Sequence, residues 1–251
     1  MIVIKFGGHA MDSNPIWMQE IAARWSAGER FVIVHGGGPQ IDKQLKIEGA
    51  ASDFQGGFRI TTPEVMKVVE SVLTGSVLRS VVRSLIQAGL PAVGISGSDA
   101  GLLKVSLKDN GALGLVGQVD AVKPQLLNHL LDGGFLPVVA PVANASDGKA
   151  LNVNADLAAG AIAGSLGADE VIFMTDVAGI YRNWPDTSSL IDEISVNELS
   201  AINFEGGMIP KVTAVIGAIK SGAQSARVID GKSLAAFKDA LARRGGTWVR
   251  A

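Results

Sequence analysis

The chain has 251 residues, of which 47% are hydrophobic, enough to bury the core of one large α/β domain or of two lobes that share a sheet. Its net charge is −2 without a basic cluster, so we expect neither nucleic-acid nor anionic-membrane binding. It has no cysteine, which excludes disulfides and thiolate chemistry and favours a reducing, cytoplasmic setting. The sequence opens on a predicted strand, so no signal peptide is expected, and its longest apolar segment, 136–143, is too short to span a membrane.

The first part of the chain alternates strands and helices. Residues 1–6 form an apolar run that predicts a strand and ends in Gly7-Gly8. A helix is expected from about Pro15, followed by a second buried strand over 31–34 and a helix with Ile41 and Leu45 on one face. This βαβα order favours a mostly parallel sheet covered by helices.

The turn after the second strand is the most informative stretch of the sequence. Gly36, Gly37 and Gly38 remove every side chain from a strand-to-helix turn, so a ligand can touch the backbone, and Pro39 suits the first turn of a helix. The N–H groups and the helix dipole then favour an anion, most simply a phosphate. A tight turn without a ligand is the alternative. An esterase oxyanion hole is a weaker one, because 94–98 does not complete Gly-x-Ser-x-Gly.

The middle of the chain departs from this alternation. Residues 49–62 form a polar, glycine-bearing segment, and a long amphipathic helix is expected from Pro63 through about residue 86. A third buried strand follows at 92–95. The alternating runs of 103–119 flank Lys108-Asp109-Asn110-Gly111, and the Asn-Gly pair predicts a β-hairpin inserted in the α/β fold.

The last part returns to strands and helices. We expect helices at 123–131, 155–166, 195–199, 210–220 and 234–243, and strands at 136–142, 171–174, 226–230 and 247–250. A shift near 166–168 predicts a boundary between an N-terminal lobe, 1–168, and a C-terminal lobe, 169–251.

Several polar residues stand at the ends of predicted strands, where ligands bind in open parallel sheets. Lys5 interrupts an apolar strand, where a buried charge needs an anion, although an exposed strand face is the alternative. Asn152, Asn154 and Asp156 follow another strand, and taken alone they could be no more than a helix N-cap. Lys211, taken alone, fits a solvated helix face. No Walker or Rossmann pattern is present, yet a phosphate remains the favoured ligand.

Seven motifs in this order resemble the amino acid kinase family over nearly the whole chain, and within it the branch that phosphorylates N-acetyl-L-glutamate. Each motif is weak alone, but their shared order is specific. They are Lys5-Phe6-Gly7-Gly8, Val34-His35-Gly36-Gly37-Gly38-Pro39, Gly57-Phe58-Arg59-Ile60-Thr61, Gly94-Ile95-Ser96-Gly97, Asn152-Val153-Asn154-Ala155-Asp156, Thr175-Asp176-Val177-Ala178-Gly179-Ile180 and Gly206-Gly207-Met208-Ile209-Pro210-Lys211.

The resemblance implies a three-layer αβα sandwich, with the acyl-amino acid in the N-terminal lobe and ATP in the C-terminal lobe. It implies that Lys5 and Lys211 contact the transferring phosphoryl group, that Asp156 orients both lysines, and that Gly8 and Gly38 donate N–H groups. It implies that the substrate is bound by Arg59 and Asn152 beside Gly37 and Gly38. The implied nucleotide-binding residues are Gly7, Asp176, Val177, Gly179, Ile180, Tyr181, Asn203, Glu205, Gly206 and Gly207.

The implied reaction is ATP-dependent phosphorylation of the side-chain carboxylate of N-acetyl-L-glutamate, with Mg²⁺ carried on ATP rather than held by a protein metal site. Such a transfer needs alignment and positive charge more than a base, because the carboxylate is already ionised at neutral pH. One alternative is a sister kinase that acts on α-aminoadipate or glutamate carried on a protein. Another is a nucleotide-binding protein of the same fold without turnover.

The chain departs from the family motifs at Thr62, Arg79, Ser98 and His9, which we expect to bear on the substrate pocket if they have an effect. Arginine-inhibited relatives carry an extra helix before the first strand. Because this sequence opens on the strand, the resemblance implies a homodimer without arginine inhibition.

Overall fold

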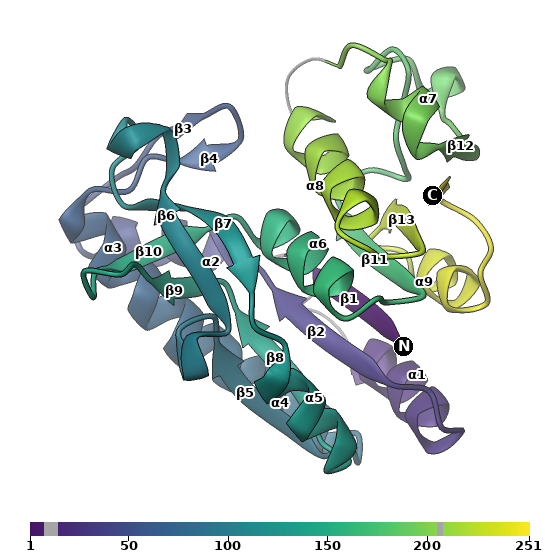
Figure 1. The fold of residues 1–251 in the computed structure, drawn as a ribbon, viewed down its shortest axis with the longest axis horizontal. Helices are drawn as coiled ribbons and strands as arrows, with labels where there is room; N and C mark the ends of the chain where they lie inside the picture. Colours follow the sequence, from purple (N-terminus) through teal and green to yellow (C-terminus); the bar gives the residue numbers. More distant parts are fainter. Residues whose placement is uncertain (8–14, 205–207) are drawn as a thin grey trace.

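The computed structural model describes residues 1–7, 15–204 and 208–251, and its largest sheet has eight strands (Figure 1). Their order across the sheet is β12-β14-β13-β11-β1-β2-β8-β5. The six from β13 to β5 run parallel, and β14 and β12 are reversed at one edge. The strands are β1 (Ile2–Phe6), β2 (Phe31–His35), β5 (Ala92–Ser96), β8 (Leu136–Ala140), β11 (Glu170–Thr175), β12 (Glu193–Ser195), β13 (Ser225–Asp230) and β14 (Thr247–Arg250).

Helices cover both faces of this sheet. They are α1 (Pro15–Ser26), α2 (Gly38–Ile47), α3 (Pro63–Glu70), α4 (Leu78–Gln87), α5 (Gln125–Asp132), α6 (Ala155–Ser165), α7 (Val196–Ser200), α8 (Met208–Lys220) and α9 (Leu234–Leu241). Within the described ranges, no helix combines the length and the apolar character that crossing a membrane requires.

The alternation of side chains along β1 shows the three layers. Ile2, Ile4 and Phe6 pack into a core with residues of α1, α4 and α9, whereas Val3 faces a second core with residues of α5, α6 and α8. Successive side chains of a strand point to opposite faces, so each core is one side of the sheet. The three-layer αβα sandwich with a mostly parallel central sheet is therefore confirmed.

The predicted β-hairpin is present, but it belongs to a separate four-stranded sheet and its turn is longer than expected. Strands β6 (Leu103–Leu107) and β7 (Val116–Val122) are antiparallel, and β7 continues to β10 (Ala150–Val153) and β9 (Val142–Asn144). Asp109 and Asn110 have φ of 48° and 53°, which asparagine and aspartate tolerate well. The connection runs over 108–115 and not only over the four residues 108–111, and the backbone of Leu113 and Leu115 pairs with Thr61.

Two further segments contain features that the sequence analysis did not predict. In the polar segment 49–62, β3 (Phe54–Gln55) and β4 (Phe58–Arg59) form a small antiparallel pair. The long helix from Pro63 passes through a π-helical segment, Ser71–Val77, before it continues as α4. There the hydroxyls of Thr74 and Ser76 donate to the carbonyls four residues earlier. Such π segments are frequent at functional sites, and this one lies beside the cavity described next.

Candidate active site

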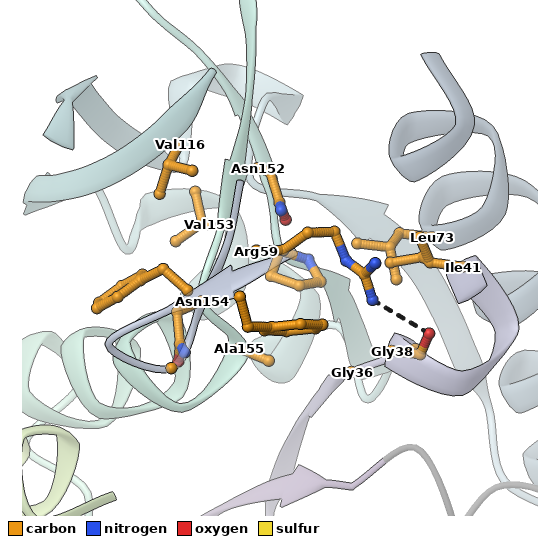
Figure 2. A pocket seen from close by; sticks show the side chains of 15 residues that line it. Gly36, Gly38, Ile41, Arg59, Leu73, Val116, Asn152, Val153, Asn154 and Ala155 are labelled. Atoms are coloured by element: carbon orange, nitrogen blue, oxygen red, sulfur yellow. Dashed lines mark hydrogen bonds between the residues drawn. The ribbon is translucent and has the colours of Figure 1, made fainter. Parts of the chain in front are cut away.

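A cavity of about 160 Å³, open to solvent, lies at the carboxyl ends of the central strands (Figure 2). The loop after β2 forms one wall, the β3–β4 pair another, and β10 with the start of α6 a third. Leu73 of the π-helical segment and Val116 of β7 add apolar surface. Segments from across the first 155 residues thus meet at the edge where parallel sheets bind ligands.

The glycine loop after β2 presents bare backbone to this cavity. Gly37 is the N-cap residue of α2 without a side-chain cap, and a Cβ there would come within 2.6 Å of Leu73 Cδ2. Gly38 also lines the cavity, and a Cβ built on it would lie 4.0 Å from Arg59 Nη2. The uncapped N–H groups and the dipole of α2 therefore favour an anion in the cavity.

His35 shapes this loop from behind. Its ring is fully buried, and Nδ1 lies 2.8 Å from the Gly36 carbonyl, so Nδ1–H is the donor. Burial lowers the pKa of His35 to about 4, and the hydrogen bond to Gly36 offsets this only in part. A neutral imidazole that holds a carbonyl in place is a structural group and not a proton donor to substrate.

This burial predicts a pH-dependent stability. Between pH 6.5 and about 4 the unfolded chain binds a proton at His35 that the folded chain does not, so stability falls as pH falls. One proton corresponds to about 1.4 kcal/mol per pH unit. Urea unfolding at several pH values should show this slope in the wild type and lose it in His35→Gln. The exposed His129 on α5 offers the control, since a slope lost equally in His129→Gln would contradict the assignment.

Arg59 is buried and held by several oxygens. Its Nη1 lies 2.6 Å from Ser52 Oγ and 2.6 Å from Asp42 Oδ1, and its Nη2 donates to the Gly38 carbonyl over 3.4 Å (Figure 2). Its guanidinium also lies 4.6 Å from the ring centroid of Phe54. A guanidinium has five N–H donors, so two have no partner among the described residues. Arg59 is thus a fixed cation on the cavity wall with capacity to bind a carboxylate.

Asn152 lines the same cavity from β10. Its Nδ2 donates to Thr61 Oγ1 over 3.1 Å, and Thr61 itself is fully buried. The sequence interpretation missed Asp42, Ser52, Phe54 and Thr61 as contacts of the candidate substrate residues. Asp42 and Thr61 are far in sequence from the residues they touch, so no local spacing reveals these contacts, whereas Ser52 and Phe54 reach Arg59 through the β3–β4 pair, which the sequence analysis did not predict.

Lys5 and Asp156 form an ion pair of 2.8 Å, with side-chain exposures of 13% and 12%. Lys5 points to the same face of β1 as Val3, which α6 covers, and Asp156 lies in the first turn of α6. Asn154 is the N-cap of that helix, and its Oδ1 accepts from the backbone N–H groups of Asp156 and Leu157. The charge of Lys5 is therefore already compensated by Asp156, so a bound anion is not required to explain its burial.

Lys211 pairs with Asp176, with Nζ 3.4 Å from Oδ1. Burial works against ionisation of Asp176, yet the charge of Lys211, with hydrogen bonds, keeps the pKa of Asp176 below its ordinary value. Asp176 directly follows β11, the neighbour of β1, so the two lysines come to the same edge of the sheet. That Asp156 orients Lys211 as well as Lys5 stays a prediction, because the ion pair that the structure gives Lys211 is with Asp176.

The packing of α6 on α8 also brings Lys5 and Lys211 to the same edge of the sheet. A Cβ on Gly160 would lie 2.8 Å from the Ala214 carbonyl, and one on Gly164 would lie 2.4 Å from Ser221 Cβ. The two helices therefore run side by side in the same direction at close range. About one turn before the Gly160–Ala214 contact stand Asp156 on α6 and Lys211 on α8.

Five of the predicted nucleotide residues, Asp176, Val177, Gly179, Ile180 and Tyr181, follow β11. Ile180 and Tyr181 are buried, the Ile180 N–H donates to Thr247 Oγ1 over 2.7 Å, and the Tyr181 ring lies 5.0 Å from that of Trp184. A Cβ on Gly179 would come within 2.4 Å of Thr247 Oγ1. Val177 N–H donates to Thr175 Oγ1, Gly7 lies against the Met174 carbonyl, and Asn203 is exposed. Gly8, His9, Glu205, Gly206 and Gly207 lie outside the described residues.

Two of the positions that depart from the family motifs make local hydrogen bonds, and a third is exposed. Thr62 is the N-cap of α3, where its Oγ1 accepts from Val65 N–H over 3.3 Å. Ser98 Oγ donates to Asn144 Oδ1 over 3.1 Å, and Arg79 is exposed on α4. None of the three lines the cavity.

The chain belongs to the amino acid kinase family, whose sequence profile matches residues 1–230. Its fold and its glycine-lined cavity agree with that class of protein, and so do Lys5 and Lys211, each of which forms an ion pair with an aspartate. The most similar relatives include the acetylglutamate kinase of Corynebacterium jeikeium (strain K411), 43% identical over 92% of this chain and 77% of the relative. The acetylglutamate kinase of Corynebacterium glutamicum (strain ATCC 13032) is 41% identical over 92% and 83%. Among solved structures, smu.665 from Streptococcus mutans UA159 has a TM-score of 0.85 at 26% identity, covering 100% of this chain and 98% of that chain.

Proposed function

We propose that the protein transfers the γ-phosphoryl group of ATP to the side-chain carboxylate of N-acetyl-L-glutamate, which gives N-acetyl-L-glutamyl 5-phosphate and ADP in arginine biosynthesis. The observation that carries this proposal is the cavity that buried Arg59 and partly buried Asn152 line together with Gly37 and Gly38 at the N-terminus of α2. Arg59 would bind the α-carboxylate, Asn152 the acylated amine, and Gly37 and Gly38 would line the pocket. The similar acetylglutamate kinases support this choice of substrate.

The charges near the sheet edge suit the chemistry of the transfer. Phosphoryl transfer has a loose transition state with negative charge on the equatorial oxygens. Lys5 and Lys211 would neutralise that charge, and the N–H groups of Gly38 and Gly8 would hydrogen-bond the same oxygens. Asp156 fixes the Lys5 amine at 2.8 Å, so little reorganisation of Lys5 would be needed. The attacking carboxylate is already ionised, so no side chain has to act as a base.

The C-terminal lobe, 169–251, would bind the nucleotide, and the N-terminal lobe, 1–168, the acyl-amino acid. The nucleotide pocket would be formed around Gly7 and by Asp176, Val177, Gly179, Ile180, Tyr181, Asn203, Glu205, Gly206 and Gly207. Across the described chain, no group of three or more His, Asp or Glu side chains could hold a metal ion. We propose that Mg²⁺ is bound by the phosphate oxygens of ATP, where it would supply further positive charge.

A coupled ADP-release assay tests the proposed function. It would compare N-acetyl-L-glutamate, L-glutamate, L-aspartate, UMP and carbamate as acceptors, with ATP and Mg²⁺. We expect turnover with N-acetyl-L-glutamate and little with the others. Activity on UMP or carbamate alone would replace the proposed substrate by another, and ATP binding without any turnover would identify a non-catalytic member of the family.

We further propose that the protein is a cytoplasmic homodimer, as the family resemblance implies. Light scattering of the purified protein should then give twice the mass of the chain at all concentrations used in the assay. A hexameric mass, or inhibition of the assay by added L-arginine, would contradict this expectation.

A further inference from the structure

Thr61 lies behind the cavity, where three segments of the chain meet. It is fully buried and does not line the cavity itself. Its N–H donates to the Leu113 carbonyl over 2.9 Å, and its carbonyl accepts from Leu115 N–H over 2.6 Å, so the β6–β7 connection, 108–115, holds its backbone on both sides. The neighbouring Leu115 carbonyl accepts from Asn152 N–H over 2.9 Å. Thr61 is thus fixed in place relative to the strand that carries Asn152.

The backbone contact in this arrangement requires a glycine. Gly114 has φ of +73°, and a Cβ built on it would come within 2.2 Å of the Thr61 carbonyl oxygen. The β6–β7 connection therefore approaches Thr61 as closely as backbone can. Because these contacts involve only main-chain atoms, a change of the Thr61 side chain leaves them intact.

The hydroxyl of Thr61 determines which way the Asn152 amide is turned. Thr61 Oγ1 donates to the Arg59 carbonyl over 2.8 Å, and Asn152 Nδ2 donates to Thr61 Oγ1 over 3.1 Å. A hydroxyl has a single proton, and a carbonyl can only accept. Once that proton is given to Arg59, Oγ1 can only accept from Asn152. The NH₂ end of Asn152 must then face Thr61, and its Oδ1 is left to face the cavity.

We infer that Thr61 is a positioning residue which makes the cavity selective for a substrate with an N–H donor on its α-carbon. This inference rests on the proposed function and deepens it. An acylated amine offers one N–H to Asn152 Oδ1, whereas the matching ester offers only oxygen lone pairs. With the ester, Asn152 Oδ1 meets another acceptor in a partly buried place, which is costly because neither group is then satisfied.

The experiment compares two substrates on three proteins. The substrates are N-acetyl-L-glutamate and 2-acetoxyglutarate of the same configuration, in which an ester oxygen replaces the N–H. The proteins are the wild type, Thr61→Val, which keeps the shape and loses the hydroxyl, and Thr61→Ser, which keeps the hydroxyl and loses a methyl group. We expect the wild type and Thr61→Ser to prefer the amide by roughly 10²-fold in kcat/KM, and Thr61→Val to prefer it by less than about tenfold.

The KM for ATP distinguishes a loss of Asn152 positioning from a general distortion of the active site. It should stay within about twofold in all three proteins. If Thr61→Val does not fold, the pair Thr61→Ala and Thr61→Ser makes the same comparison of hydroxyl against no hydroxyl. Unchanged preference for the amide in the variant without the hydroxyl would overturn the role of Thr61 and leave the proposed function intact. A wild type that phosphorylates neither compound would overturn both.

Discussion

A Lys5→Ala variant is expected to turn over roughly 10²–10³ times more slowly than the wild type, with KM for both substrates changed only a few-fold. The reason is that Lys5 stands at the carboxyl end of the central strand with its amine fixed by Asp156, beside the bare loops where a phosphoryl group would bind. Interactions made mainly in the transition state lower kcat when they are removed. Lys211→Ala should have a similar effect, because the Lys211 amine pairs with Asp176 at the same edge of the sheet.

Stability must be measured beside turnover for Lys5→Ala. The substitution leaves Asp156, whose side chain is 12% exposed, without its cation, which costs stability in its own right. Urea unfolding therefore accompanies the kinetics, and rates are expressed per folded molecule. Lys104→Ala, an exposed lysine of β6, is the matched control and should leave kcat unchanged. Near-normal kcat in folded Lys5→Ala would remove Lys5 from the proposed mechanism.

An Arg59→Ala variant is expected to raise KM for N-acetyl-L-glutamate by about 10²-fold and to leave KM for ATP nearly unchanged. A charge-assisted hydrogen bond contributes about 1.5–3 kcal/mol, and the two donors of Arg59 without described partners can both meet a carboxylate. Arg59→Lys should restore little, because a lysine amine cannot reproduce the planar pair of donors. Steady-state kinetics with each substrate varied in turn would measure both constants.

The control for Arg59 is Arg83→Ala, which removes an exposed arginine of α4 away from the cavity. Loss of Arg59 also frees Asp42, but that side chain is 57% exposed, so water can solvate its charge. Equal increases in KM for ATP and for N-acetyl-L-glutamate would show that Arg59 supports the structure as a whole and does not bind the carboxylate.

Much of the fold could be predicted because its signals are local. The apolar run over 31–34, the glycines after it and Pro39 lie within a few residues of each other, and they gave β2 and the start of α2 correctly. The hairpin was found from its alternating strands, but the length of its turn was not. That length depends on Thr61, which lies far away in the sequence and pairs with the β6–β7 connection.

In the candidate site, too, the residue types could be predicted from local motifs, whereas their contacts could not. The motifs select Arg59, Asn152, Lys5 and Asp156 as residue types suited to a carboxylate and a phosphoryl group. They do not show that Arg59 is held by Asp42, because this contact forms only when α2 and the β3–β4 pair fold against each other. Lys211 was expected beside Asp156, whereas its described ion pair is with Asp176.

The sequence by itself determined the order of the elements, the sheet and the set of residues from which a site could be built. These follow from the spacing of hydrophobic residues, from glycine turns and from helix caps, which are all properties of neighbouring residues. The tertiary structure alone decided which charges are paired and which way polar groups face. Lys5 meets Asp156 across 151 positions of chain only because β1 and α6 pack face to face, and Asn152 turns its oxygen to the cavity only because Thr61 has a single proton to give. Both depend on distances that folding sets, and spacing along a chain does not contain them.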